Sequence, residues 1–353
     1  MMWGMVVSPG AAMFVLMSTV GTLMVLFSSG LLGMWICLEV GFFGFIPLLN
    51  GKTVGENESC VKYFVVQSVG SGLLLFSFLI IAGDYLSMVM GAGWGLMGDF
   101  MMVLGFMVKL GVFPMHFWFP SVMGSASWFS CFWLSVVQKL GPFWAFGGLG
   151  FSSTSLFVLI LALISTSVVG AFGGLAQVQF RPLLAYSSLG QTGWLGLVVL
   201  LNTQIFILYI GLYSAILVGL LWGLNMLSAY DLVSVPGWSS GKGLYFWMFG
   251  CSFFISLSGL PPLAGSAMKM VGVLLLAGYY PVFLGVLIFT SMVSLYYYLT
   301  MFISGVVYVG GSGFSSLDSI VTKDGMSVAL LLLVGLNWLG GFPLFLLTAT
   351  ATF

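Results

Sequence analysis

Apolar runs about as long as a membrane-crossing helix recur along almost the whole sequence, separated by short polar, glycine-rich or proline-rich breaks. A helix needs roughly 20 mostly apolar residues to cross a bilayer. Of the 353 residues, 61% are hydrophobic and only 5% are charged, whereas soluble domains carry charges at about a quarter of their positions. The sequence therefore predicts an all-α, polytopic integral membrane protein with no soluble domain.

The breaks in the sequence predict about eleven transmembrane helices. The ninth run is too long for one straight helix, and the segment LSGLPPLAGS (257–266) interrupts it, so we expect two half-helices joined at membrane depth. The clearest loops are expected at 50–59, 228–243 and 310–325. The predicted spans are 5–27, 31–49, 61–82, 96–116, 127–147, 153–176, 182–201, 204–228, 244–276, 281–304 and 328–349.

The rare basic residues indicate an orientation. If the chain crosses the membrane eleven times, five of them fall in connections on the side of the N-terminus. These are Lys52, Lys62, Arg181, Lys242 and Lys323. Because basic loops stay on the cytoplasmic or matrix side, the N-terminus is predicted there and the C-terminus on the opposite side.

Four charged residues, Glu39, Lys109, Lys139 and Lys269, fall within predicted spans. Each costs about 2.5 to 3.5 kcal/mol on insertion scales, so something must offset their placement. Loss of hydration favours the neutral form of a lysine, whereas a nearby carboxylate favours the charged form. Such a set is typical of a proton relay and gives no sign of a metal site or a nucleophile. A lysine that reaches the interface by snorkelling is the alternative interpretation.

Helix-breaking residues accompany these lysines. Lys109 is followed by Gly111 and Pro114, and Lys269 is preceded by Pro261 and Pro262. If spans 1–5 and 6–10 are two repeats, both breaks fall in the fourth span of a repeat, and the odd number of spans gives the repeats opposite orientations. Interrupted helices at matching positions are typical of inverted-repeat transporters.

We therefore expect one membrane domain over residues 1–353, with discontinuous helices near 96–116 and 244–276. Repeat one would cover about 1–147, repeat two about 153–304, and a final helix about 328–349.

Two further features lie close to the lysines. The Gly141–Pro142 step after Lys139 is expected to free backbone carbonyls nearby. His116 is the only histidine, and histidine is a group that titrates near neutrality, so it could join the relay, although a lone histidine at a helix end is more often structural.

Other chemistry finds no support. The four cysteines, Cys37, Cys60, Cys131 and Cys251, are far apart, and we assign them neither a metal nor a disulfide. No G-x-G-x-x-G motif follows a predicted strand, which argues against a dehydrogenase that acts alone.

Six stretches, in this order and spacing, resemble the antiporter-like membrane subunits of respiratory complex I, in particular the mitochondrially encoded NADH dehydrogenase subunit 2. They are WICLEVGFFGFIPLL (35–49), KYFVVQSVGS (62–71), MVKLGVFPMHFWFPSV (107–122), VVQKLGPF (136–143), RPLLAYSSLGQTGWL (181–195) and LSGLPPLAGSAMKM (257–270).

The resemblance implies roles for the intramembrane charges. Glu39 and Lys109 match the paired Glu and Lys near the proton entry. Lys139 matches the central lysine and Lys269 the lysine of the second broken helix. The resemblance also implies about eleven helices and proton movement from the matrix to the intermembrane space across the mitochondrial inner membrane.

The implied setting is a large complex. NADH, FMN, iron–sulfur clusters and ubiquinone would act in other subunits, and this chain would bind no cofactor. Its partners would be other membrane-arm subunits, including antiporter-like ones, and membrane lipids, with no nucleic acid.

Two positions depart from the family pattern. Gln191 stands where the family usually has His, and Ser121 stands where an acid often follows the FHFWxP motif. Because Gln carries no proton, a proton role at residue 191 is in doubt.

Two rival interpretations stay open. A stand-alone cation/proton antiporter of the same superfamily would need its own ion-selective site. A structural membrane subunit would bury paired lysines without transport, because buried ion pairs also contribute to packing specificity in some proteins.

Overall fold

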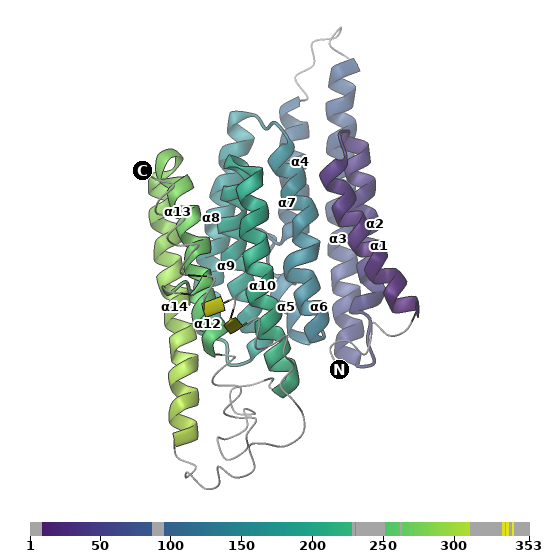
Figure 1. Ribbon diagram of the computed structural model, residues 1–353. Coiled ribbons are helices and arrows are strands. Elements are labelled where there is room, and N and C mark those ends of the chain that lie inside the picture. Colours follow the sequence, from purple (N-terminus) through teal and green to yellow (C-terminus); the bar gives the residue numbers. More distant parts are fainter. Residues whose placement is uncertain are drawn as a thin grey trace. The chain divides into compact units, whose positions relative to one another are not determined.

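The computed structural model describes residues 9–86, 95–227, 230, 251–261, 263–310, 334–335, 337–338 and 341, and within them the chain forms helices joined by short links (Figure 1). The predicted loops at 228–243 and 310–325 and the final predicted span lie almost entirely outside the described residues. The first ten predicted spans each overlap a described helix or helix pair.

The helices before the middle of the chain are α1 (Pro9–Phe27), α2 (Leu31–Leu49), α3 (Val54–Leu86), α4 (Gly95–Leu110), α5 (Trp118–Ser125), α6 (Trp128–Phe132), the π-helical segment η1 (Trp133–Val137) and α7 (Gln138–Gly148). They are followed by α8 (Ser153–Leu175), α9 (Phe180–Leu201), α10 (Thr203–Leu227), α12 (Cys251–Ser258), α13 (Ala264–Tyr279) and α14 (Pro281–Gly310).

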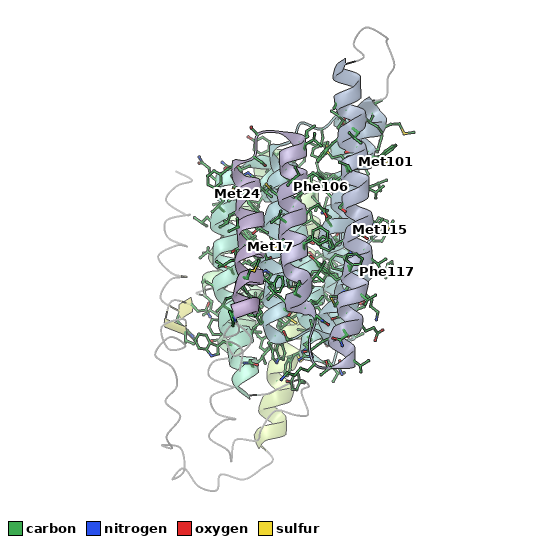
Figure 2. The ribbon with its side chains drawn as sticks, turned by 90° about the vertical axis from the view of Figure 1, so that its right-hand side faces the viewer. Met17, Met24, Met101, Phe106, Met115 and Phe117 are labelled. Carbon is green, nitrogen blue, oxygen red and sulfur yellow. The ribbon has the colours of Figure 1, made fainter. Side chains whose placement is uncertain are left out.

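Among the described residues, 7 helices are long and apolar enough to cross a membrane: α1, α2, α3, α8, α9, α10 and α14. The outward side chains suit a lipid-facing exterior, since Met24, Met115 and Phe117 are 53%, 46% and 75% exposed (Figure 2). The prediction of an all-helical membrane protein is confirmed.

The predicted loop at 50–59 is wrong for most of its length, because α3 already begins at Val54. Thr53 and Glu56 form a reciprocal cap there. The Thr53 N–H donates to Glu56 Oε2 at 3.1 Å, and the Glu56 N–H donates to Thr53 Oγ1 at 3.2 Å. A T-x-x-E capping box satisfies two otherwise orphaned N–H groups and begins a helix in spite of the polar sequence.

Helices α1 and α2 pack so closely that their backbones touch. Gly21 lies against the backbone of Gly41, and a Cβ on Gly44 would lie 2.9 Å from the Ser18 Cα, so neither glycine could carry a side chain without separating the helices. Small residues allow this close approach in membrane helices, where no hydrophobic driving force pulls helices together.

Both predicted helix interruptions are present. Helix α4 ends at Leu110 and α5 begins at Trp118, so the fourth predicted span stops short of residue 116. Helix α12 ends at Ser258 and α13 begins at Ala264. Each break contains a left-handed glycine, Gly111 with φ 69° and Gly259 with φ 87°, a conformation that side-chain-bearing residues rarely adopt.

Two features of the backbone near Lys139 bear on the carbonyls that the Gly141–Pro142 step is expected to free. Helix α7 continues through Pro142, and the wide π-helical turn η1 lies directly before Gln138. Because Pro142 has no N–H, it cannot donate to the Gln138 carbonyl four residues before it. Lys139 therefore follows an irregular turn and precedes a proline, within one short helix.

The chain divides into two compact units. One contains Trp3–Gly170 and Ser188–Gln204, and the other contains Ala171–Ser187 and Ile205–Phe353. The first unit holds Glu39, Lys109 and Lys139, and the second holds Lys269.

Candidate functional site

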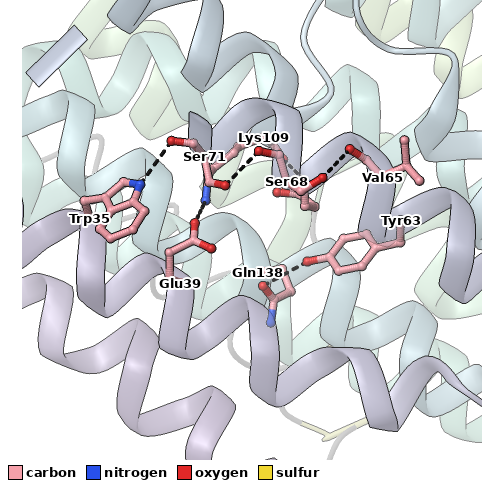
Figure 3. A network of polar contacts seen from close by, with 9 residues as sticks. Trp35, Glu39, Tyr63, Val65, Ser68, Ser71, Lys109 and Gln138 are labelled. Carbon is pink, nitrogen blue, oxygen red and sulfur yellow. Dashed lines mark hydrogen bonds and ion pairs between the residues drawn. The ribbon is translucent and has the colours of Figure 1, made fainter. Parts of the chain in front are cut away.

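A buried ion pair joins α2 and α4. The Lys109 Nζ donates to Glu39 Oε1 at 2.9 Å, and the two side chains are only 3% and 12% exposed (Figure 3). The centroid of the Phe42 ring lies 6.0 Å from the same Nζ. The structure thus brings together the two residues that the sequence suggested as a Glu–Lys pair.

The end of α4 explains why Lys109 is available for this pair. The last carbonyls of a helix have no partner within the helix. Here Trp118 Nε1 donates to the Val108 carbonyl at 3.1 Å, and Gln67 Nε2 donates to the Lys109 carbonyl at 3.0 Å. Since two side chains cap these carbonyls, the ammonium of Lys109 is not needed there and can face Glu39.

Small residues and a hydroxyl complete the surroundings of this break. A Cβ on Gly70 would lie 3.0 Å from Lys109 Cγ, so the glycine leaves room for the lysine stem. In the link after α4, the Phe113 N–H donates to Thr166 Oγ1 of α8 at 2.9 Å. These contacts hold a non-helical backbone segment inside protein, where membrane proteins tolerate it.

A second polar network holds the residue next to Lys139. Gln138 Oε1 accepts from Tyr63 Oη at 3.1 Å (Figure 3), and its Nε2 donates to Ser18 Oγ at 2.9 Å and to the Gly41 carbonyl at 3.2 Å. Trp133 Nε1, from η1, donates to the same Ser18 Oγ at 2.8 Å. Because an amide orients hydrogen bonds but carries no proton at ordinary pH, Gln138 fixes this segment and does not relay.

Lys139 is only 3% exposed and sits on α7. Its Nζ donates to the Ser188 carbonyl of α9 at 3.2 Å and lies 4.3 Å from the centroid of the Phe119 ring. Within the described part of the chain, the ion pairs are Lys109–Glu39 and Lys62–Glu58. Lys139 therefore has a carbonyl and an aromatic face as neighbours where Lys109 has a carboxylate.

Lys269 follows the second break and is 9% exposed. Its Nζ donates to the carbonyl of Ser258, the last residue of α12, at 2.6 Å. The partial negative charge of a helix C-terminus favours a cation at this place. In this break the lysine itself caps the half-helix, whereas in the first break Trp118 and Gln67 do so.

His116 lies in the link between α4 and α5 and is buried. Its ring centroid is 4.1 Å from that of Phe117 and 5.8 Å from that of Phe113. These aromatic contacts agree with a structural role, and participation of His116 in a relay stays a prediction.

The two departures from the family pattern are both placed on helices. Gln191 is buried in α9, and the Ser121 hydroxyl donates to the carbonyl of Trp118 in its own helix at 2.8 Å. Neither observation assigns a proton role to these positions.

The sequence analysis did not single out Gln67, Tyr63, Gln138 and Phe119 as site residues. Gln67 and Gln138 carry a signal that was available, because each is an amide within an otherwise apolar span. Tyr63 and Phe119 carry none, since aromatic residues are common in such spans and only their contacts distinguish them.

Comparison with known proteins gives the family. Residues 28–303 match the family described as NADH:quinone oxidoreductase/Mrp antiporter, TM. NADH-ubiquinone oxidoreductase chain 2 of Lumbricus terrestris is 32% identical over 305 residues, 84% of this chain and 87% of the relative. The chain belongs to the NADH-ubiquinone oxidoreductase chain 2 family. The Mytilus edulis member is 31% identical over 325 residues, covering 91% of this chain and 92% of its own length.

Solved structures agree on the fold. A chain of respiratory complex I from Thermus thermophilus superposes with a TM-score of 0.78 at 24% identity, covering 95% of this chain and 79% of that one. A chain of the archaeal membrane-bound sulfane sulfur reductase gives 0.76 at 20% identity, covering 96% and 74%. A chain of the Mrp complex from Dietzia gives 0.69 at 19% identity, covering 83% and 59%.

No group of three or more His, Cys, Asp or Glu side chains gathers in a metal-binding arrangement within the described residues. Each of the three buried lysines has a different kind of partner. Buried amines of this kind can hold or release protons.

Proposed function

We propose that this chain is a proton-translocating subunit of the membrane arm of respiratory complex I. It would couple electron transfer from NADH to ubiquinone, performed in other subunits, to proton movement from the matrix to the intermembrane space. The relay residues are Glu39, Lys109, Lys139 and Lys269, with His116 as a possible further member.

The observation that carries the proposal is the environment of Lys139. When a lysine is buried, its charge loses the stabilisation given by water. One carbonyl and one aromatic ring, the neighbours of Lys139, replace less of that stabilisation than a carboxylate does. The charged form of Lys139 therefore has less electrostatic support than that of Lys109 beside Glu39. A group poised in this way can gain and lose a proton within a cycle.

The three lysines support a sequence of steps. While Glu39 holds its charge, Lys109 stays protonated, and loss of that pairing releases the Lys109 proton toward the centre of the chain. Lys139 takes up and passes on a proton as its own surroundings change. Lys269, held at the C-terminus of α12, is the last acceptor on the way to the intermembrane space.

The proposed architecture has eleven helices in two inverted five-helix repeats plus one final helix. The two interruptions, each with a left-handed glycine, support the repeats. The N-terminus would face the matrix and the C-terminus the intermembrane space of the mitochondrial inner membrane. Exposed Lys52 and Lys62 near the start of α3 support that orientation, while Lys242 and Lys323 lie outside the described residues.

The chain would perform no redox chemistry and bind no cofactor itself. Its partners would be other membrane-arm subunits, including antiporter-like ones, and lipids. The names of its relatives and of the solved complexes support these subunit partners.

The test is the proton-to-electron ratio of the assembled complex with Lys139→Gln, measured in membrane vesicles. We expect NADH oxidation to continue while proton pumping falls. Lys62→Gln is the matched control, because Lys62 is exposed and paired with Glu58 at 2.7 Å, and it should pump normally.

The rival functions give different results. Unchanged pumping by Lys139→Gln, with assembly intact on a native gel, would indicate a structural subunit. Cation/proton exchange by the chain reconstituted without the other subunits would indicate a stand-alone antiporter.

A further inference from the structure

The first turn of α5 touches the surroundings of two relay lysines. Trp118 Nε1 donates to the carbonyl of Val108, the residue before Lys109. Its neighbour Phe119 presents its ring to the ammonium of Lys139, with Nζ 4.3 Å from the ring centroid. Two consecutive side chains of the half-helix after the break therefore reach Lys139 and the carbonyl of the residue before Lys109.

The contact with Lys139 has the geometry of a cation–π interaction. An ammonium within about 6 Å of an aromatic centroid is attracted by the negative face of the ring, and the attraction grows when both groups are removed from water. Phe119 is 1% exposed and Lys139 is 3% exposed, so this pair is removed from water. A neutral amine does not feel this attraction, and the ring therefore favours the charged form alone.

Neighbouring residues pack against both the base and the ring of Phe119. A Cβ on Gly111 would lie 3.3 Å from the Cβ of Phe119, so the left-handed glycine of the break packs directly against the base of this side chain. The Trp118 ring also meets the Phe119 ring edge-on, with centroids 5.5 Å apart. The break in the helix thus determines where the ring meets Lys139.

We propose that Phe119 is a positioning residue for Lys139, which it holds in the charged form between α5 and the Ser188 carbonyl of α9. This inference rests on the proposed relay. A displacement of α5 would withdraw the ring from Lys139 and the indole from the Val108 carbonyl together. The half-helix would therefore act on both lysines at once.

Other charged groups do not provide this interaction. Of the elements packed against α7, α1 carries no titratable residue, and neither does α5. Helix α2 contributes Glu39 and α4 contributes Lys109, which are paired with each other, and Asp99 of α4 accepts from the Ser152 N–H at 3.0 Å. The remaining titratable residues of these helices lie on α2, α9 and α3. They are Cys37 on α2, Arg181 and Tyr186 on α9, before Ser188 in the chain, and on α3 Tyr63 beside Gln138, with Glu56, Glu58, Cys60 and Lys62 near the helix start and Asp84 and Tyr85 near its end.

The test is the pH profile of the proton-to-electron ratio in vesicles carrying the assembled complex. Phe119→Leu removes the ring face and keeps an apolar side chain. Because the charged form of Lys139 loses its support, we expect the alkaline limb of the profile to move to lower pH by about half a unit to one and a half units. Phe119→Tyr keeps a ring face and should leave the profile in place.

Phe146→Leu is the matched control. Phe146 is also fully buried, and its ring meets those of Phe106 and Phe143, so the same substitution removes a buried ring without touching a lysine. If Phe119→Leu does not assemble, Phe119→Met, with a flexible side chain that adapts to gaps, gives the same comparison.

The outcomes separate this inference from the function on which it rests. An unshifted profile in Phe119→Leu, or an equal shift in Phe119→Tyr or Phe146→Leu, would overturn the role of Phe119 while pumping still depended on Lys139. Normal pumping by Lys139→Gln would overturn the relay itself, and the role of Phe119 with it.

Discussion

The buried Glu39–Lys109 pair gives a prediction whose size follows from its geometry. Glu39→Gln removes the carboxylate charge and leaves the ammonium of Lys109 buried. At 2.9 Å and an effective dielectric constant of about 20, the lost attraction is about 6 kcal/mol. Removing one partner of a buried pair typically costs about 3 to 5 kcal/mol.

Deprotonation of the lysine limits that cost. Neutralising an ordinary lysine costs about 1.4 kcal/mol for each pH unit below 10.4, which is about 4.6 kcal/mol at pH 7 and about 2 kcal/mol at pH 9. In the variant, folding with a neutral Lys109 releases a proton, so its stability rises with pH. The native ion pair needs no such neutralisation of Lys109. The deficit of Glu39→Gln should therefore shrink by more than half between pH 7 and pH 9.

The assay is the fraction of membrane arm that stays assembled after graded heating, at pH 7 and at pH 9. Glu58→Gln is the control, since it breaks the exposed Lys62–Glu58 pair, whose side chains are 46% and 62% exposed, and should change nothing measurable. Glu39→Gln combined with Lys109→Met should recover much of the loss, because no charge is left buried. Equal effects of Glu39→Gln and Glu58→Gln, or a deficit that does not depend on pH, would refute this reasoning.

Two further predictions concern the backbone. Gly259→Ala should destabilise the second break by about 1 to 3 kcal/mol, measured by thermal unfolding of the complex, and should reduce proton pumping. The reason is that Gly259 has a φ of 87° and that the new Cβ would lie 2.6 Å from the Lys269 Cδ. Thr53→Ala should remove the cap of α3 at a cost of about 1 kcal/mol, and speed hydrogen exchange in its first turn about fivefold.

Each of these has a control within the same protein. Gly278→Ala, on α13, meets no atom within 4 Å and should be neutral or stabilising. Thr19→Ala removes a hydroxyl that bonds only within its own helix, to the Leu16 carbonyl, and should leave α3 unchanged. A stable, normally pumping Gly259→Ala complex, or unchanged exchange at the start of α3 in Thr53→Ala, would contradict the corresponding prediction.

The fold was predicted well wherever the bilayer dictates the pattern. Runs of apolar residues gave the helices, and glycines and prolines gave the breaks after Leu110 and Ser258. The sequence prediction places the start of α3 too late although the chain contains the T-x-x-E signature, because a polar stretch favours a loop. The π-helical turn before Lys139 carries no composition of its own, since it is a difference in hydrogen-bond register and not in residue type.

The candidate site was only partly predictable. That Lys109, Lys139 and Lys269 are buried follows from their place in apolar runs. Which partner each has does not follow, because residues 70 positions apart, such as Glu39 and Lys109, meet only when α2 and α4 pack in one register. The cap from Gln67, 42 positions from Lys109, is also non-local, whereas Trp118 lies only 10 positions from Val108.

From the sequence alone it follows that this protein lies in a membrane, where its helices break, and that lysines lie within its spans. A bilayer forbids unsatisfied backbone and makes charges costly, so composition and the positions of Gly, Pro and Lys suffice for these conclusions. The packing of the helices was needed to show that Lys109 faces a carboxylate, Lys139 an aromatic ring and a carbonyl, and Lys269 the end of a half-helix. The reason is that the charged form of a buried group is favoured or disfavoured by atoms within a few ångströms, and helix packing alone brings those atoms together.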